Sequence, residues 1–223
     1  MNIGAIFDWD GVVANTELPH LESWRMLAKA HGHVIPDNFM LDTFGKRNLE
    51  IIPNILGWTK DVAEVVKLSD EKEVYYRGII AEKGLPLVAG VEDFLRALNA
   101  AGIPCAIGSS SPRSNLDQAL DVLGFAPLFS AVVSMEDVSR GKPAPDVFLL
   151  AAEKIGVDPR RCAVFEDSEA GIDAANAAKM KSVAVATTRP ADFWESRWQG
   201  FPDAIIADFL PMTPEILASF WRK

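Results

Sequence analysis

IGAIFDWDGVV, residues 3–13, is a short apolar run that stops at two aspartates, Asp8 and Asp10. A run of this length that ends at a turn signal is typical of a buried strand. Gly11 then allows a sharp turn at which both carboxylates project. An Asp followed by Gly is also an ordinary turn signal, so an ordinary turn stays open as an interpretation of this stretch alone.

Four further apolar runs of similar length predict strands of the same sheet, at residues 103–107, 131–133, 162–165 and 182–186. Amphipathic helix patterns lie between them, with apolar residues at i, i+3, i+4 and i+7 in 91–98 and 116–123. Gly102 follows the first of these helices as an end signal. Strands that alternate with helices predict an α/β fold, a Rossmann-like parallel sheet with helices on both faces.

The segment 15–86 interrupts this alternation, because it has helical patterns and no convincing strand. Helices are predicted near residues 21–28, 48–56, 60–67 and 70–83. We therefore predict a core domain of residues 1–14 and 87–223 and an inserted α-helical cap domain of residues 15–86. The insert leaves the core directly after the first strand, so a lid over the carboxyl ends of the strands is expected, where open α/β sheets bind ligands.

The composition indicates a soluble globular protein. Of its 223 residues 49% are hydrophobic, enough to bury a core, and the net charge of −9 disfavours a nucleic-acid partner, which needs clustered Lys and Arg. Cys105 and Cys162 lie far apart in apolar stretches, as buried reduced thiols do. The first residues lack the pattern of a signal peptide or membrane span. We expect a cytoplasmic protein without a membrane partner, and a monomer is favoured.

A second acidic pair, Glu166 and Asp167, follows another predicted strand in the way that Asp8 follows the first. Strands of one parallel sheet bring their carboxyl ends to one edge, so these side chains are expected to gather with Asp10. Carboxylates gathered there would repel one another unless a cation lay among them, and hard oxygen ligands favour Mg²⁺. Capping of the next helix by Asp167 or Ser168 is the alternative interpretation.

Two further residues could bind a phosphate group at the same edge. Ser109 ends the run that begins at Ile103, and it can present a hydroxyl and a backbone N–H. Lys142, in the stretch GKPAPD, could supply the positive charge that phosphate oxygens need. Taken alone, a serine before proline marks a loop, and a lysine beside prolines marks a solvated turn.

Four motifs, DWDGVV, GSSS, GKPAPD and EDSEAG, occur in this order, each at or near the end of a predicted strand. In type, order and setting they resemble the haloacid dehalogenase superfamily. More narrowly, they resemble its β-phosphoglucomutase-like phosphatases, whose helical cap is inserted after the first motif. The resemblance covers the core over residues 2–186, whereas the insert matches mainly in length and helical character.

The resemblance implies a catalytic role for four residues. Asp8 would attack phosphorus and form an aspartyl-phosphate. Asp10 would protonate the leaving oxygen and then activate water for the second step. Ser109 and Lys142 would bind the transferring phosphoryl group, and Lys142 would also neutralise Asp8.

The resemblance also implies how Mg²⁺, the expected cofactor, would be held. Its ligands would be Asp8, the main-chain carbonyl of Asp10, and Asp167. Glu166 would act directly or through water. Positioning and charge neutralisation of this kind are what phosphoryl transfer requires of a protein.

Residues that would contact the rest of the substrate are His20, Gly45, Lys46, Arg47, Ser110 and Arg113. Related phosphatases and mutases both often carry a histidine at the place of His20, so it does not separate them. Arg47 lies one position early for the mutase pattern, which weakens a mutase assignment. A structural histidine and ordinary surface charge are the alternatives for these positions of the insert.

These observations predict a Mg²⁺-dependent phosphatase whose partner is a small-molecule phosphate ester, a sugar phosphate or similar monoester. Carbon–halogen chemistry is disfavoured, because the dehalogenating members lack the second aspartate, here Asp10. A hexose-phosphate mutase shares every core residue and stays open as the alternative. A non-catalytic phosphometabolite-binding module is the third hypothesis, although such a module needs no paired nucleophile and acid/base.

Overall fold

The computed structural model describes residues 2–43, 46–196 and 200–222 and divides into two compact units. The core unit runs up to Asn15 and resumes at Pro86, and the helical unit is Thr16–Leu85. Each junction lies one residue from the boundary given above. The Asn15 N–H donates to the Pro86 carbonyl at 2.8 Å, which pairs the outgoing and returning chain inside the core unit.

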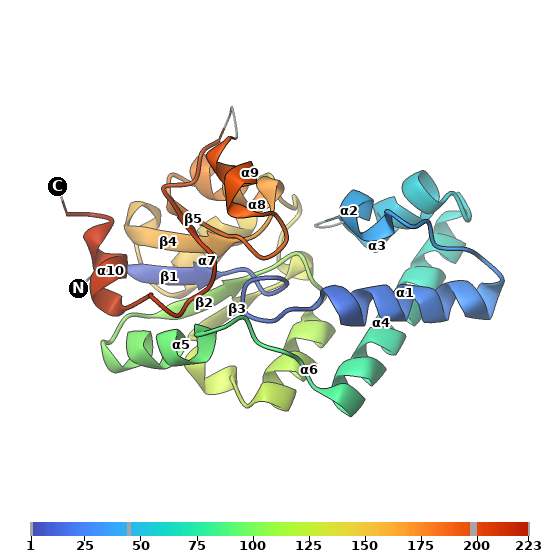
Figure 1. Cartoon of the computed structure of the whole chain (residues 1–223), viewed down its shortest axis with the longest axis horizontal. Coiled ribbons are helices and arrows are strands. Elements are labelled where there is room, and N and C mark those ends of the chain that lie inside the picture. Colours follow the sequence, from blue (N-terminus) through green and yellow to red (C-terminus); the bar gives the residue numbers. More distant parts are fainter. Residues whose placement is uncertain (1, 44–45, 197–199, 223) are drawn as a thin grey trace. The chain divides into compact units, whose positions relative to one another are not determined.

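The core unit is built on one six-stranded parallel sheet (Figure 1), in the order β3-β2-β1-β4-β5-β6. Its strands are β1 (Gly4–Phe7), β2 (Cys105–Gly108), β3 (Ala131–Val133), β4 (Cys162–Glu166), β5 (Lys181–Val185) and β6 (Ala204–Ile206). This confirms the predicted Rossmann-like α/β fold. The sequence pattern missed β6, which has no fully buried residue and so a weaker apolar signal than β3 of the same length. Cys105 and Cys162 are free and buried, as expected.

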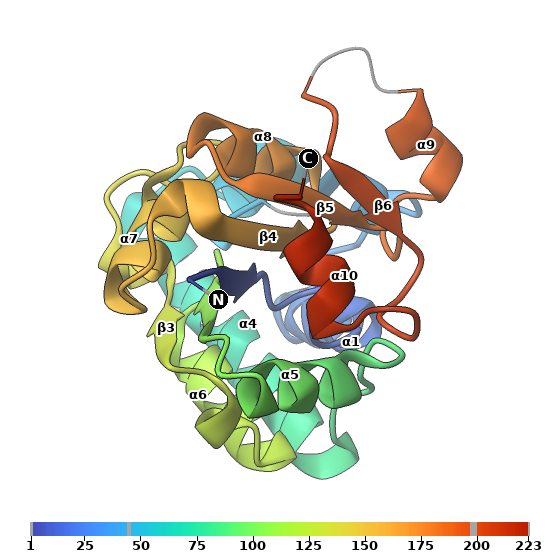
Figure 2. The ribbon, with the colours of Figure 1, turned by 90° about the vertical axis from the view of Figure 1, so that its left-hand side faces the viewer.

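Helices cover both faces of the sheet. Figure 2 shows α7 and α8 on one side of the strands and α5 and α10 on the other. The helices of this unit are α5 (Val91–Ala100), α6 (Arg113–Leu123), α7 (Asp146–Lys154), α8 (Glu169–Ala177), α9 (Ala191–Glu195) and α10 (Pro214–Ser219). Gly102, with φ of 68°, follows α5 at the predicted end.

Successive strand residues face opposite sides of the sheet, so each side has its own core. Ile6 and Val164 are buried with the apolar residues of α7 and α8. On the other side, the rings of Phe7 and Phe165 stack at 4.8 Å, and Phe94 of α5 meets both edge to face. Because β1 and β4 are covered on both faces, they read as continuous apolar runs, and the polar residues begin only where they end.

The helical unit has its own apolar core, which includes Trp24 and Leu27. Its elements are α1 (Glu17–His31), α2 (Phe39–Thr43), α3 (Asn48–Glu50), the π-helix η1 (Ile51–Leu56) and α4 (Val62–Lys83). The prediction of two helices over 60–67 and 70–83 is wrong, because buried Leu68 continues the apolar face and α4 runs unbroken. No helix within the described ranges has the length and apolar character to cross a membrane.

Candidate active site

The sheet order brings the ends of β1 and β4 together. From β1 the sheet extends to β2 and β3 on one side and to β4, β5 and β6 on the other. The boundary between β1 and β4 is therefore the switch point at which open α/β sheets bind ligands. Phe7 pairs with Phe165, and the N–H of Asp8 donates to the Phe165 carbonyl at 3.0 Å. Asp8 thus leaves β1 beside Glu166 and Asp167.

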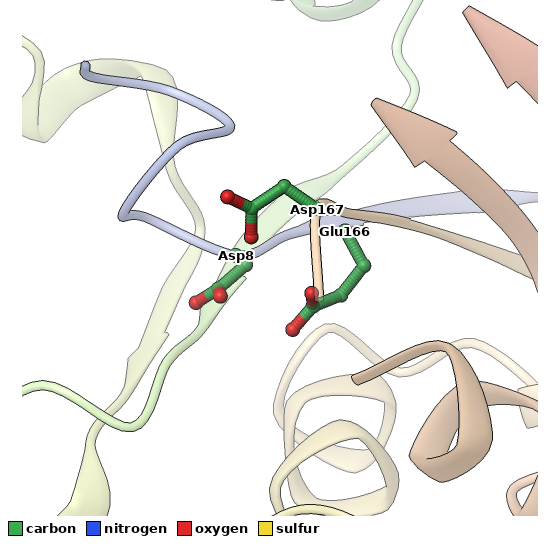
Figure 3. A group of neighbouring side chains, drawn as sticks. All are labelled: Asp8, Glu166 and Asp167. Atoms are coloured by element: carbon green, nitrogen blue, oxygen red, sulfur yellow. The ribbon is translucent and has the colours of Figure 1, made fainter. Parts of the chain in front are cut away.

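Three carboxylates gather at this point (Figure 3). One oxygen from each of Asp8, Glu166 and Asp167 lies within 4.8 Å of the others. The exposed fractions of these residues are 7%, 0% and 1%, so the group is shielded from water. The predicted convergence of these three residues is present, whereas the Asp10 carboxylate is not among them. Metal binding by the Asp10 carbonyl stays a prediction.

The three carboxylates of the acidic group repel one another when no metal ion lies among them. Burial raises the pKa of Asp8 to about 8, and the charges of Glu166 and Asp10 act in the same direction while Lys142 opposes them. Burial also raises the pKa of Asp167 well above its usual range, and the charges of Glu166 and Asp8 add to this. A divalent ion among hard carboxylate oxygens would relieve this repulsion, so the residues present fit Mg²⁺.

Lys142 lies inside this group. Its ammonium is 3.0 Å from Asp8 Oδ2 and 2.5 Å from Glu166 Oε1, and its side chain is only 4% exposed. Burial favours the neutral amine, but the two carboxylates outweigh it and raise the pKa of Lys142 above its ordinary value. A solvated turn is therefore the wrong interpretation of this lysine, which remains charged beside Asp8.

The residues after β4 divide between the acidic group and a helix cap. Ser168 is the N-cap of α8, since its Oγ accepts the N–H of Gly171 at 3.1 Å. Glu166 Oε2 accepts the Ser168 N–H at 2.7 Å and its hydroxyl at 2.9 Å. A Cβ at Gly171 would lie 1.8 Å from the Glu166 carboxyl carbon, so only glycine leaves room for this side chain. Capping thus explains Ser168, and Asp167 is left for the acidic group.

The serines after β2 are connected by hydrogen bonds, and one of them, Ser111, contacts Asp10. The expectation that Ser109 presents its backbone N–H is wrong, because that N–H donates to the Val133 carbonyl at 3.0 Å in the ladder toward β3. The buried Ser109 hydroxyl accepts the N–H of Ser111 at 3.0 Å. Ser111 Oγ in turn donates to Asp10 Oδ2. The sequence analysis did not single out Ser111, although it belongs to the GSSS motif.

Two of the predicted substrate residues belong to the core unit. Ser110 is partly buried after β2. Arg113 begins α6, and its Nε donates to Asp117 Oδ1 at 2.7 Å in an ion pair whose side chains are about half exposed. Substrate contact by Ser110 and Arg113 stays a prediction.

The other predicted substrate residues belong to the helical unit. His20 Nδ1 lies 2.7 Å from the ammonium of buried Lys72. Lys46 is exposed and Arg47 is partly buried. Gly45 lies outside the described residues. Because the two units are described separately, substrate contact by these residues stays a prediction.

Two threonines that the sequence analysis missed follow β5, and they bond to the acidic group and to the turn at Gly11. Thr188 Oγ1 donates to Asp167 Oδ2, and Thr187 Oγ1 donates to the Gly11 carbonyl at 2.6 Å. Gly11 has φ of 71°, and a Cβ there would lie 1.9 Å from Asp167 Oδ2. The available signal was two hydroxyls directly after a predicted strand, at the edge where the other motifs end.

Thr188 is expected to affect metal binding without taking part in it. Thr188→Ala removes the hydrogen bond that orients Asp167, so Mg²⁺ affinity should fall about 10- to 100-fold. Thr188→Ser keeps the hydroxyl and should bind Mg²⁺ within about threefold of wild type. Calorimetric titration of the metal-free proteins measures this directly, and equal affinities of the alanine and serine variants would contradict the prediction.

The sheet order and the switch point define a Rossmann-like α/β core that carries its polar residues at the ends of β1 and β4. Residues 4–179 match the family of haloacid dehalogenase-like hydrolases. The match covers most of the chain, which therefore belongs to this family.

Proteins similar in sequence and in structure agree with this family assignment. The chain is 37% identical over 192 residues to the chloroplastic 5-amino-6-(5-phospho-D-ribitylamino)uracil phosphatase of Arabidopsis thaliana, covering 84% of the chain but only 51% of that relative, about half its length. It is 34% identical to the fructose-1-phosphate phosphatase of Escherichia coli, covering 82% and 95%. Among solved structures, β-phosphoglucomutase from Clostridium difficile superposes with a TM-score of 0.82 and 27% identity, covering 99% and 97%. Family and relatives confirm the prediction of a phosphoric monoester hydrolase.

Proposed function

We propose that this chain is a Mg²⁺-dependent phosphatase that hydrolyses a small phosphorylated metabolite, most simply a sugar phosphate, through an aspartyl-phosphate at Asp8. The observation that carries the proposal is the Asp8 carboxylate, buried at the switch point, 3.0 Å from the Lys142 ammonium and beside Asp167. The phosphatase relatives support the substrate class, since one is named for a phosphorylated ribityl compound and another for fructose 1-phosphate.

Each carboxylate oxygen of Asp8, the proposed nucleophile, has a partner that restrains the side chain. Its Oδ1 accepts the N–H of Trp9 at 2.7 Å, and its Oδ2 lies 3.0 Å from the Lys142 ammonium. In the first step a carboxylate oxygen bonds to phosphorus, the bond from phosphorus to the ester oxygen breaks, and Asp10 gives that oxygen its proton. Lys142 and the Ser109 hydroxyl bind the phosphoryl oxygens.

In the second step the phosphoryl group leaves Asp8. Asp10, now a carboxylate, takes a proton from water as the water oxygen bonds to phosphorus and the bond to Asp8 breaks. The products are inorganic phosphate and the original carboxylate. One residue thus acts as acid and then as base, and the two aspartates of DWDGVV divide the chemistry between them.

Asp8, Asp167 and the Asp10 carbonyl would hold Mg²⁺. Glu166 is better suited to contact through water, because Oε1 is bound to Lys142 and Oε2 to Ser168. When bound, the ion would neutralise the carboxylates and the charge of the phosphoryl group. A cytoplasmic location and a monomeric state stay predictions.

The first test is release of inorganic phosphate from a panel of sugar, nucleotide and short-chain phosphates. We expect at least one sugar phosphate to be hydrolysed in Mg²⁺. Chelation with EDTA should lower the rate at least about 100-fold, since the phosphoryl charge and the acidic group then lose their counter-ion, and added Mg²⁺ should restore it. A flat panel, or a rate that is unchanged by EDTA, would contradict the proposed function.

A hexose-phosphate mutase is the second candidate, favoured by the likeness to β-phosphoglucomutase over nearly the whole chain. The two activities differ in the fate of the phosphoryl group. Incubation with β-glucose 1-phosphate and a catalytic amount of bisphosphate separates them, because only a mutase forms glucose 6-phosphate without net release of phosphate.

A further inference from the structure

We propose that Ser111 is a positioning residue that orients the Asp10 carboxylate for proton transfer to the leaving oxygen. The inference rests on the function proposed above, because it concerns the same reaction. Asp10 follows β1 and Ser111 follows β2, and these strands are neighbours in the sheet. The Ser111 hydroxyl donates a hydrogen bond to Asp10 Oδ2. This contact joins the first and second motifs through two side chains.

The backbone of Ser111 is held on both sides. Its N–H donates to the buried Ser109 Oγ at 3.0 Å, and its carbonyl accepts the N–H of Met135 at 3.3 Å. Pro112 follows and restricts the preceding residue to extended conformations. The direction from which the Ser111 hydroxyl meets Asp10 is therefore set by the fold before any substrate binds.

Asp10 follows β1 at a tight turn and is only partly buried. The Trp9 carbonyl accepts the N–H groups of Val12, Val13 and Ala14, which fixes the backbone of this turn. A general acid must present its proton along the line to the leaving oxygen, and loss of that alignment lowers the rate.

The hydrogen bond engages Oδ2 of Asp10. In the proposed step the other oxygen, Oδ1, therefore gives its proton to the ester oxygen as the bond from that oxygen to phosphorus breaks. The alcohol departs, and Asp10 becomes a carboxylate whose charge the Ser111 hydroxyl stabilises. In the second step Oδ1 accepts a proton from the attacking water, which returns Asp10 to its starting state.

An effect exerted through Asp10 must depend on the leaving group. A p-nitrophenolate departs readily without a proton, whereas an unsubstituted phenolate benefits from one. We expect Ser111→Ala to lower kcat/KM about 10- to 100-fold for phenyl phosphate and less than about threefold for p-nitrophenyl phosphate. The quantity kcat/KM is chosen because it covers only the steps up to formation of the phosphoenzyme, when the leaving group departs.

The experiment measures kcat/KM for a series of para-substituted phenyl phosphates and plots its logarithm against the leaving-group pKa. The Ser111→Ala line should be steeper than that of wild type, and Ser111→Thr, which keeps the hydroxyl, should restore the wild-type slope. Ser130→Ala is the matched control, because Ser130 is exposed and its N–H bonds to Cys105 at the start of β2. That variant should match wild type throughout.

The outcomes separate the inference from the proposed function. A fall of equal size for every ester would mean that Ser111 supports the fold or the phosphate, and it would overturn the inference, as would no change at all. In either case wild-type activity would leave the phosphatase assignment standing. If wild type hydrolysed neither these esters nor the metabolite panel, the proposed function itself would fail, and the inference with it.

Discussion

Asp8→Asn should abolish phosphate release while the protein remains folded. The amide cannot form the phosphoenzyme, so we expect the turnover rate to fall at least about 10⁴-fold for every substrate that wild type accepts. The shape of the side chain is unchanged, and one oxygen remains to accept the Trp9 N–H that Asp8 accepts at 2.7 Å. Steady-state phosphate release and a circular dichroism spectrum test the two halves of this prediction.

The same substitution should change how stability depends on pH. Burial raises the pKa of Asp8 from 3.8 to about 8, so between these values the folded metal-free protein binds more protons at this residue than the unfolded chain does. The free energy of unfolding of wild type should therefore fall as pH rises through that window. Asparagine does not titrate, and the variant should lose less stability between pH 5 and pH 8.

Thermal unfolding in EDTA at these two pH values provides the measurement. The expected result is a variant that is inactive yet at least as stable as wild type at pH 8. If the variant were inactive but unfolded at a much lower temperature than wild type, the loss of activity would reflect misfolding and would not test the role of Asp8. Residual turnover above about one per cent would show that Asp8 is not the nucleophile.

Lys142→Met should have the second-largest effect. It removes the ammonium that lies 3.0 Å from Asp8 and 2.5 Å from Glu166, and so leaves the buried carboxylates without that counter-charge. Loss of a preorganised positive group that also binds phosphoryl oxygens should lower kcat by about 10²- to 10³-fold. Removal of one partner of a buried ion pair lowers the free energy of unfolding by about 3 to 5 kcal/mol. The metal-free variant should therefore also unfold more readily at pH 8.

A nearby arginine provides the control for Lys142→Met. Arg140 lies two residues before it, pairs with Asp146 at 2.9 Å and has a side chain that is 69% exposed. Arg140→Met removes the same charge from solvent, where an ion pair contributes little, so it should change stability by less than about 1 kcal/mol and activity by less than twofold. If the two variants behaved alike, burial of Lys142 in the acidic group would have no functional role.

Much of the fold could be predicted because its signals are local. Apolar runs of three to five residues indicated five of the six strands, and periodic apolar residues indicated the helices between them. The strand β6 and the continuity of α4 were missed for the opposite reason. All three residues of β6 are only half-buried, so its apolar signal is weak. A helix that continues past Leu68 looks the same in sequence as two helices with a break.

The sequence indicated the charged residues of the candidate site and Ser109, but not the hydroxyls of Ser111, Thr187 and Thr188. Carboxylates after a buried strand are unusual enough to be noticed, whereas serine and threonine after a strand are common in loops. The Ser109 N–H was misjudged because its use depends on β3 lying beside β2, where it meets the Val133 carbonyl. A neighbouring strand is not visible in the local pattern.

The order of its amino acids was sufficient to determine that this protein has an acidic pair after each of two buried strands, a lysine among prolines and an inserted helical segment. The fold in three dimensions decided which polar groups meet: Ser111 lies 101 residues from Asp10, and Thr188 lies 21 residues from Asp167. The physical reason is that hydrogen bonds reach about 3 Å, so partners at such separations are set by strand order and register, which arise only when the whole sheet has formed.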